Sequence, residues 1–299
     1  MRTEGQVVVV GAGLMGTGIA HGFAVAGHPV LLVDTSGEQR DKAVAAIAKL
    51  LDDGVARGKI ADSDAAAARA RITATAQIDA QAADAALLIE TATEQLEIKH
   101  AILRAAEAVL PADALIATNT SALSISEIAS VVGDASRVIG MHFFNPVPKM
   151  KLVELIRGLE TSDEALAVAK GWIGGLGKDH IVVAEAPGFT TSRMSALMGN
   201  EAMYMLAEGV ASAEDVDKAM RMAFNHPMGP LELGDLTGWD TRLKVLQYLH
   251  TVLGEKFRPC PLIIKMVKSG RHGRKVGRGV YEYDASGAKI PGSGLKVGL

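Results

Sequence analysis

The sequence predicts an α/β fold, in which a doubly wound and mostly parallel sheet is followed by an all-α domain. From Val7 to about Glu185, apolar runs of strand length alternate with helical patterns, which is typical of a parallel sheet. After Pro187 the strand-like runs stop and periodic helical segments follow. A chain of 299 residues also exceeds what one hydrophobic core usually supports. We therefore expect two domains, residues 1–186 and 187–299.

The first strand leads into a glycine-rich turn. The apolar run Val7–Val10 is followed by a GxGxxG segment that opens a helical pattern, and this segment consists of Gly11, Ala12, Gly13, Leu14, Met15 and Gly16. The first glycine permits a tight turn, the second lets the main chain approach a pyrophosphate, and the third lets the helix pack closely on the strand. The free N–H groups at the start of the helix favour the same anion. This order predicts a Rossmann-type dinucleotide-binding domain.

An acidic residue follows the second strand. The run Pro29–Val33 ends in Asp34, about 20 residues after the turn, which is the spacing of a ribose-binding carboxylate. Such a carboxylate accepts hydrogen bonds from the adenosine hydroxyls and repels a 2′-phosphate, so it favours NAD over NADP. The nearby Arg40 weakens this discrimination. The alternative is a glycine-rich turn beside a surface aspartate, which the strand, helix and spacing disfavour.

The remaining elements complete the two domains. Between the second strand and the next lies a long alanine-rich, charged insertion, about residues 36–71, which we predict as two helices joined near residues 54–59. Residues 65–76 are predicted as helix. The later strands are predicted at Ala86–Glu90, Ala114–Thr118, Val138–His142, Lys151–Ile156 and His180–Val183. The helices of the second domain are predicted at Thr190–Ala207, Ala213–Ala223, Gly238–Leu253 and Pro261–Lys268.

Composition excludes several classes of function. The chain has 31 basic and 34 acidic residues mixed along its length and a net charge of −3, so it has no overall attraction for nucleic acid. Cys260 is the only cysteine, which excludes an internal disulfide, argues against a metal cluster and fits a reducing compartment. No signal-peptide core precedes the first strand, and no apolar run reaches the roughly 18 residues of a membrane span. We expect a cytoplasmic protein that binds neither nucleic acid nor membrane.

Two residues in the later strands indicate acid/base chemistry. His142 ends an apolar strand, and open α/β sheets bind ligands at the carboxyl ends of their strands. Glu154 lies in an apolar run, where an unpaired carboxylate would be costly. If Glu154 holds one imidazole nitrogen, it fixes the tautomer and raises the basicity of the other. Asn119 and Ser121 follow another strand and are expected to face the same crevice. The alternatives are a capped core histidine and a solvated acid.

Long motifs occur throughout the chain. They are GAGLMGTGIA in the first turn, IETATE from Ile89, NTSALSI from Asn119, HFFNPVPKMKLVELI from His142, PGF from Pro187, PMGPLEL from Pro227, and GRKVGRGVYEY near the end. Together they resemble the L-3-hydroxyacyl-CoA dehydrogenases, particularly the stand-alone bacterial 3-hydroxybutyryl-CoA type. The resemblance covers nearly the whole sequence.

The resemblance implies NAD-dependent, reversible oxidation of a short-chain (3S)-3-hydroxyacyl-CoA to a 3-oxoacyl-CoA. His142 would be the acid/base, Glu154 would orient it, and Ser121 would bind the reacting oxygen. Besides the turn and Asp34, the implied cofactor contacts are Glu94, Lys99, Asn119, Ser121, Asn145 and Lys275. The implied contacts to the CoA moiety are Lys49, Arg57 and Lys59. The family also implies a homodimer formed through the C-terminal domain.

One position departs from the family. Ser192 stands where the family usually has an asparagine near the catalytic histidine and the substrate. Serine offers one hydroxyl in place of an amide, so we expect a changed substrate position or rate with activity retained. Two alternative functions stay open: a related dehydrogenase of a free hydroxy acid, and a non-catalytic NAD-binding protein. The residues determine neither the acyl chain length nor the physiological direction of the reaction.

Overall fold

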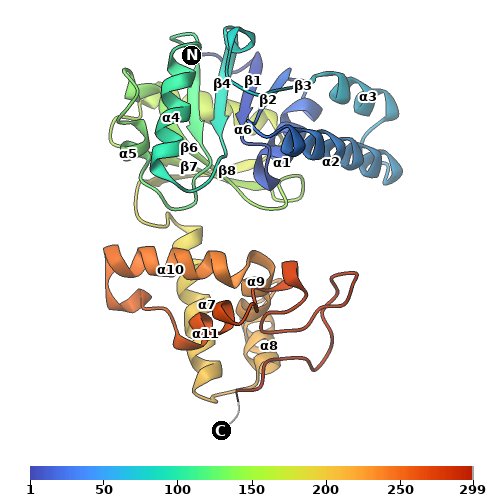
Figure 1. Cartoon of the computed structure of the whole chain (residues 1–299), viewed down its shortest axis with the longest axis vertical. Helices are drawn as coiled ribbons and strands as arrows, with labels where there is room; N and C mark the ends of the chain where they lie inside the picture. The colour runs from blue at the N-terminus through green and yellow to red at the C-terminus, as the bar shows by residue number, and fades with distance from the viewer. Residues whose placement is uncertain (298–299) are drawn as a thin grey trace. The chain divides into compact units, whose positions relative to one another are not determined.

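The chain divides into two structural units at residue 186. The computed structural model describes residues 1–297, and Figure 1 shows its elements in chain order. The first unit contains an eight-stranded sheet with helices between the strands, and the second unit is built from helices. This arrangement confirms the predicted fold class. Among residues 1–297, no helix is both long and apolar enough to span a membrane.

The sheet has the order β3-β2-β1-β4-β5-β6-β7-β8. Its strands are β1 (Gln6–Val10), β2 (Val30–Val33), β3 (Ile72–Thr75), β4 (Ala85–Glu90), β5 (Leu115–Thr118), β6 (Val138–Phe143), β7 (Leu152–Arg157) and β8 (Asp179–Ala184). Neighbouring strands from β3 to β6 are parallel, whereas β7 is antiparallel to β6 and parallel to β8. The chain moves outward in opposite directions from β1 and β4, so the switch point for ligand binding lies between these two strands.

The insertion after β2 differs from its prediction at one end. It contains the two expected helices, α2 (Gly37–Ala56) and α3 (Asp62–Ala70). Residues 72–75, predicted as part of a helix, instead form β3, in which Ile72 pairs with Val30 of β2. The prediction was wrong because β3 is an edge strand with no continuous apolar run, and its β-branched residues gain their stability from pairing with β2.

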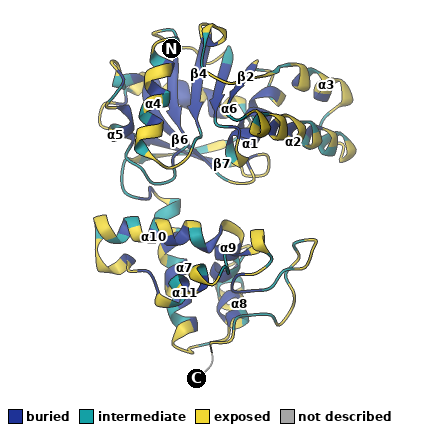
Figure 2. Cartoon of the chain, in the orientation of Figure 1, coloured by how far each residue is buried: buried dark blue, intermediate teal, exposed yellow. Residues whose placement is uncertain are grey.

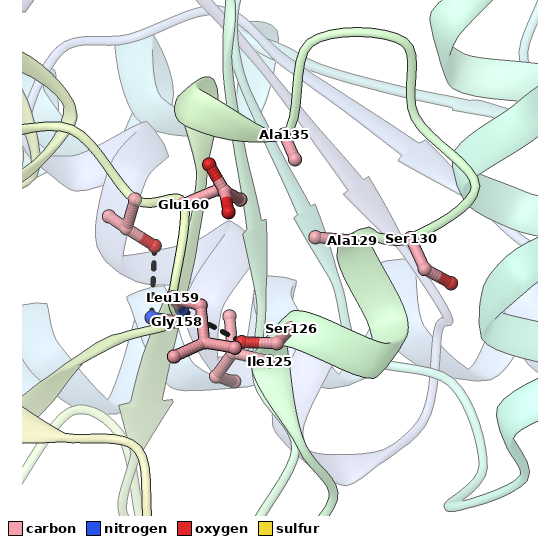
Figure 3. Close-up of a pocket in the computed structure, with 9 residues that line it drawn as sticks. Ile125, Ser126, Ala129, Ser130, Ala135, Gly158, Leu159 and Glu160 are labelled. Carbon is pink, nitrogen blue, oxygen red and sulfur yellow. Dashed lines mark hydrogen bonds between the residues drawn. The ribbon is translucent and has the colours of Figure 1, made fainter.

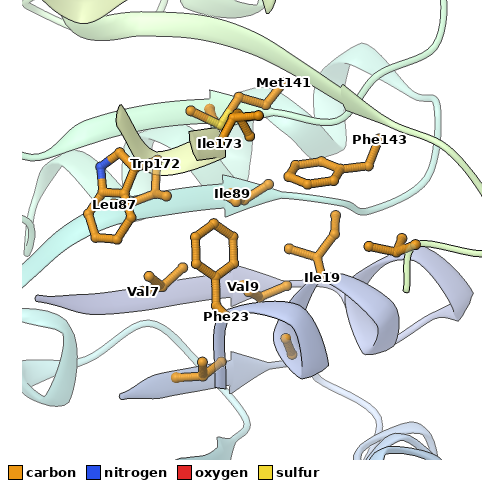
Figure 4. Packing of buried hydrophobic residues seen from close by; sticks show 14 of the residues in the cluster. Val7, Val9, Ile19, Phe23, Leu87, Ile89, Met141, Phe143, Trp172 and Ile173 are labelled. Carbon is orange, nitrogen blue, oxygen red and sulfur yellow. The ribbon is translucent and has the colours of Figure 1, made fainter. Parts of the chain in front are cut away.

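Helices α1 and α6 cover one face of the sheet. They are α1 (Leu14–Val25) and α6 (Asp163–Gly175), and the rings of Phe23 and Trp172 meet edge to face with their centroids 5.8 Å apart. Figure 4 shows both rings packed over Val7, Val9 and Leu87 of the sheet. The strands between the two edge strands β3 and β8 are buried along most of their length (Figure 2). The other helices of this unit are α4 (Leu96–Glu107) and α5 (Ile125–Ala129).

The second unit contains one helix that the sequence analysis did not identify. Its helices are α7 (Thr191–Ala207), α8 (Ala213–Ala223), α9 (Pro230–Thr237), α10 (Trp239–Leu253) and α11 (Pro261–Lys268). Helix α9 is bounded by glycines and contains a third, Gly234, so it carries less of a helical apolar pattern than α11, which has the same length. Pro230 at its first turn is a favourable start, because the missing N–H has no partner in the helix there.

Buried carboxylates attach the C-terminal segment to the helices of this unit. Asp235 accepts hydrogen bonds from the Trp239 indole (2.6 Å), the Val280 and Tyr281 N–H groups (2.7 and 2.8 Å) and the Tyr283 hydroxyl (3.1 Å). Burial raises the pKa of Asp235, and these four donors act in the opposite direction. Asp217 likewise accepts from the Tyr281 hydroxyl at 2.8 Å. The GVYEY motif is therefore held by carboxylates in α8 and α9.

The Asp235→Asn variant should lower the free energy of unfolding by about 3 kcal/mol, because an amide turned toward these donors leaves buried N–H groups without an acceptor. Urea unfolding followed by circular dichroism measures the change. Glu201→Gln, an exposed substitution on α7 with the same change in charge, is the control and should leave the midpoint unchanged. Equal stability of both variants would show that the network contributes little.

Candidate active site

The glycine turn after β1 has two crowded glycines and one open glycine. Gly11 adopts a left-handed φ of +106°, and its N–H donates to the Val33 carbonyl at 2.7 Å. A Cβ on Gly16 would lie 1.8 Å from the Gly11 oxygen, so only glycine fits where α1 packs on the turn. A Cβ on Gly13 would meet nothing within 4 Å. The backbone at Gly13 therefore faces open space at the start of α1, as a bound pyrophosphate requires.

Asp34 is fixed beside this turn. Its carboxylate accepts hydrogen bonds from the Ala12 N–H (2.8 Å) and the Ser36 N–H (2.9 Å), which join the ends of β1 and β2. The Arg40 guanidinium donates to the Asp34 carbonyl oxygen. The residues of the turn and Asp34 therefore fit NAD, since open backbone and an anchored acid lie side by side. Their individual contacts with the cofactor stay predictions.

Two glycine variants should separate cofactor binding from folding. Gly13→Ala, whose backbone angles suit any residue, should keep the melting temperature and weaken NADH binding about tenfold or more by filling the open space. Gly16→Ala should lower the melting temperature because its Cβ collides with backbone. Fluorescence titration with NADH and thermal melting measure both effects. Unchanged NADH affinity in a folded Gly13→Ala protein would contradict the placement of the pyrophosphate.

His142 and Glu154 lie directly opposite each other in the sheet. Strands β6 and β7 are antiparallel with His142 in register with Glu154, so both side chains point to one face. The Nδ1 atom of His142 lies 2.7 Å from Oε2 of Glu154, whose side chain is 0% exposed. Because a carboxylate only accepts, Nδ1 carries the proton of a neutral ring and Nε2 is its basic nitrogen. The ring of Phe144 packs against the imidazole, with centroids 4.7 Å apart.

A buried ion pair between Lys99 and Glu90 lies at the ends of β4 and β5. The sequence analysis identified Lys99 and missed Glu90. The Lys99 ammonium, 1% exposed, lies 3.0 and 2.8 Å from the two carboxylate oxygens of Glu90, which also accepts from the Thr118 hydroxyl at 2.6 Å. Glu90 ends an apolar strand, as His142 does, and that position was the available signal. The cofactor contact implied for Lys99 stays a prediction.

Glu94 orients Ser121. Its carboxylate accepts from the Ser121 N–H (2.6 Å), the Ser121 hydroxyl (2.9 Å) and the Thr120 hydroxyl (2.8 Å), while the Lys99 ammonium lies 3.6 Å away. The Ser121 proton therefore points to Glu94, and its oxygen keeps lone pairs for another donor. Asn119 accepts from the Phe143 N–H at 2.8 Å and so joins the end of β5 to the strand of His142.

The other predicted site residues are not brought into these clusters. Asn145 is exposed in the connection after β6. Lys49, Arg57 and Lys59 are exposed on α2 or directly after it. Ser192 is half-buried in the first turn of α7 in the second unit. Lys275 also belongs to the second unit, and its ammonium forms an ion pair with Asp240 at 2.7 Å. Among residues 1–297, no group of acidic, histidine or cysteine side chains could hold a metal ion.

A separate pocket is shown in Figure 3. It has a volume of about 250 Å³ and is lined by α5, Ala135 and residues 158–161. At its edge the Ser126 hydroxyl accepts a hydrogen bond from the Leu159 N–H at 2.8 Å. The lining described here includes none of the predicted catalytic or binding residues.

Comparison with protein families decides the membership of the chain. The model described as "3-hydroxyacyl-CoA dehydrogenase, NAD binding domain" matches residues 6–186, and the corresponding C-terminal domain model matches residues 188–283. The chain belongs to the 3-hydroxyacyl-CoA dehydrogenase family. This membership confirms the predicted family, the NAD-dependent enzyme class and the cofactor.

Individual members of the 3-hydroxyacyl-CoA dehydrogenase family are similar over nearly their whole length. A 3-hydroxybutyryl-CoA dehydrogenase of Bradyrhizobium diazoefficiens is 44% identical over 93% of this chain and 95% of its own. That of Clostridioides difficile is 40% identical over 93% of this chain and 99% of its own. The crystal structure of (S)-3-hydroxybutyryl-CoA dehydrogenase from Ralstonia eutropha has 45% identity and a TM-score of 0.88, covering 93% of this chain and 99% of that one.

Proposed function

We propose that the protein catalyses the reversible, NAD-dependent oxidation of a short-chain (3S)-3-hydroxyacyl-CoA, such as 3-hydroxybutyryl-CoA, to the 3-oxoacyl-CoA. The observation that carries this proposal is the buried pair of His142 and Glu154 within the part of the chain that matches the NAD-binding domain. The similarity to dehydrogenases of 3-hydroxybutyryl-CoA supports the short acyl chain.

His142 acts as the general base in the oxidative direction. Its Nε2 removes the proton of the substrate 3-hydroxyl, and bound NAD supplies the hydride acceptor for the hydrogen on the same carbon. Glu154 holds Nδ1–H at 2.7 Å and stabilises the imidazolium that results. In the reductive direction the same nitrogen returns the proton. Burial of Glu154 keeps water from competing for this hydrogen bond.

Ser121 binds the reacting oxygen of the substrate. In this structure the Ser121 hydroxyl donates to Glu94. When it turns toward the substrate, it donates to the reacting oxygen and leaves the proton of the 3-hydroxyl to His142 Nε2. We therefore assign Ser121 to orientation and His142 to proton removal. Ser192 stands in place of the asparagine usual in the family. Its side chain is shorter, and it would contact the substrate through one hydroxyl in place of an amide.

The remaining contacts are those that the family resemblance implies. The glycine turn would hold the pyrophosphate, Asp34 the adenosine ribose, and the residues near the nicotinamide would be Glu94, Lys99, Asn119, Asn145 and Lys275. Lys49, Arg57 and Lys59 are exposed, and the described side chains form no ion pair with them. Such cations suit the phosphates of CoA.

Acetoacetyl-CoA should be reduced with loss of NADH absorbance, and His142→Ala should lower kcat by about 10²- to 10⁴-fold because proton transfer is lost. NADH affinity should change by less than about twofold, since His142 lies outside the glycine turn. Glu154→Gln should also lower the rate. His180→Ala, on the edge strand β8, is the control and should retain activity.

Two outcomes would contradict this assignment. If NADH bound but no acyl-CoA or free hydroxy acid were turned over, the protein would be a non-catalytic NAD-binding protein. If a free hydroxy acid were the only substrate, the chemistry would hold and the assignment of CoA would be wrong. A substrate series from about four to sixteen carbons then defines the chain length accepted by the active enzyme.

We also infer a homodimer formed through the second unit, and a cytoplasmic location. Helix α7 exposes apolar side chains, with Met194 at 65%, which supports a subunit contact. Sedimentation equilibrium should give twice the chain mass of 31.2 kDa, and Met194→Asp should shift it toward the monomer. A monomeric mass for the unaltered chain would contradict the dimer. The buried free thiol of Cys260 supports a reducing compartment.

A further inference from the structure

The connection between β6 and β7 joins the two strands that carry the acid/base pair. It spans residues 144–151, which is longer than the two-residue turns that fix the register of a hairpin by themselves. Its first residue, Phe144, packs on the His142 ring at a centroid distance of 4.7 Å. A change in the conformation of this connection would therefore move the ring that packs on the imidazole of His142.

The ammonium group of Lys178, a residue outside the β6–β7 hairpin, holds this connection. The Nζ atom of Lys178 donates to the carbonyl oxygens of Val147 and Met150, each at 2.6 Å. Hydrogen bonds from a charged donor are shorter and stronger than those between neutral groups. The next residue, Asp179, donates its N–H to the Lys151 carbonyl at 2.7 Å, so the start of β8 is attached at the same place. Desolvation lowers the pKa of Lys178, as expected for a half-buried ammonium.

Helix α1 also packs against the connection. Val147 is buried, and a Cβ on Gly18 of α1 would lie 2.9 Å from the Val147 Cβ. His21, on the same helix, is 7% exposed, and among the described residues its ring nitrogens have no hydrogen-bond partner. Burial and the Lys178 charge lower the pKa of His21. The ring of His21 therefore makes no hydrogen bond to the carbonyls that Lys178 holds.

We propose that Lys178 is a positioning residue for the reaction. By holding Val147 and Met150 it fixes the connection on α1, the helix that begins at the glycine turn, and thereby fixes Phe144 and the ring of His142. This inference rests on the proposed function, since it gives Lys178 a role in presenting the base to the substrate.

The test compares Lys178→Met, which keeps the length and apolar stem but removes the donors, with Lys178→Arg, which retains donors. Lys178→Met should lower kcat for acetoacetyl-CoA about tenfold or more with NADH affinity within about twofold, because small displacements of a catalytic group reduce rates strongly. Lys178→Arg should recover most of the rate. Lys170→Met, an exposed substitution on α6, is the matched control and should leave kcat unchanged.

A second readout separates positioning from stability and from the assigned reaction. The ¹⁵N-coupled NMR signal of the His142 Nδ1–H proton reports its bond to Glu154, and it should shift or broaden in Lys178→Met under conditions where urea unfolding shows a folded protein. Unchanged kcat together with an unchanged signal would overturn the proposal. If the unaltered chain reduces no acyl-CoA, the proposed function fails, while the NMR signal still decides whether Lys178 positions His142.

Discussion

The antiparallel pairing of β6 with β7 is the constraint on which the site depends. Two residues in adjacent parallel strands are separated by a long crossover, whereas this hairpin brings His142 opposite Glu154, only 12 residues later. The Glu154 carboxylate is fully buried, and desolvation would make it costly without a partner. The 2.7 Å hydrogen bond to Nδ1 offsets that cost and fixes the tautomer of the ring. Fold stability and acid/base chemistry therefore require the same contact.

Buried carboxylates organise the rest of the molecule in a similar way. Glu90 holds Lys99 at the end of β4, and Lys99 lies close to Glu94, which orients the Ser121 hydroxyl. In the second unit Asp235 gathers backbone N–H groups of the C-terminal motif. In each case the hydrogen bonds from several donors offset the cost of removing the carboxylate from water. Two of the sequence motifs contain such a buried acid: IETATE contains Glu90, and HFFNPVPKMKLVELI contains Glu154.

Prediction from sequence succeeded where burial imposes a pattern. Strands such as Val7–Val10 and Ala86–Glu90 are buried on both faces, so continuous apolar runs marked them. The edge strand β3 and helix α9 were missed, because β3 has no apolar run and the apolar residues of α9 are interrupted by a glycine. The pairing of His142 with Glu154 was expected from the cost of a lone carboxylate. The partner of Lys99 was not, since Glu90 looked like the polar end of a strand.

The sequence by itself determined the class of fold, the glycine turn, the cofactor and the family, because these depend on local spacing and on long continuous motifs. Only the tertiary structure decided which polar groups meet. Lys178 is an ordinary lysine in the chain, and only the folded sheet brings its ammonium to two carbonyls of a distant connection. Hydrogen bonds depend on distance and direction in space, and sequence spacing does not specify these between remote segments.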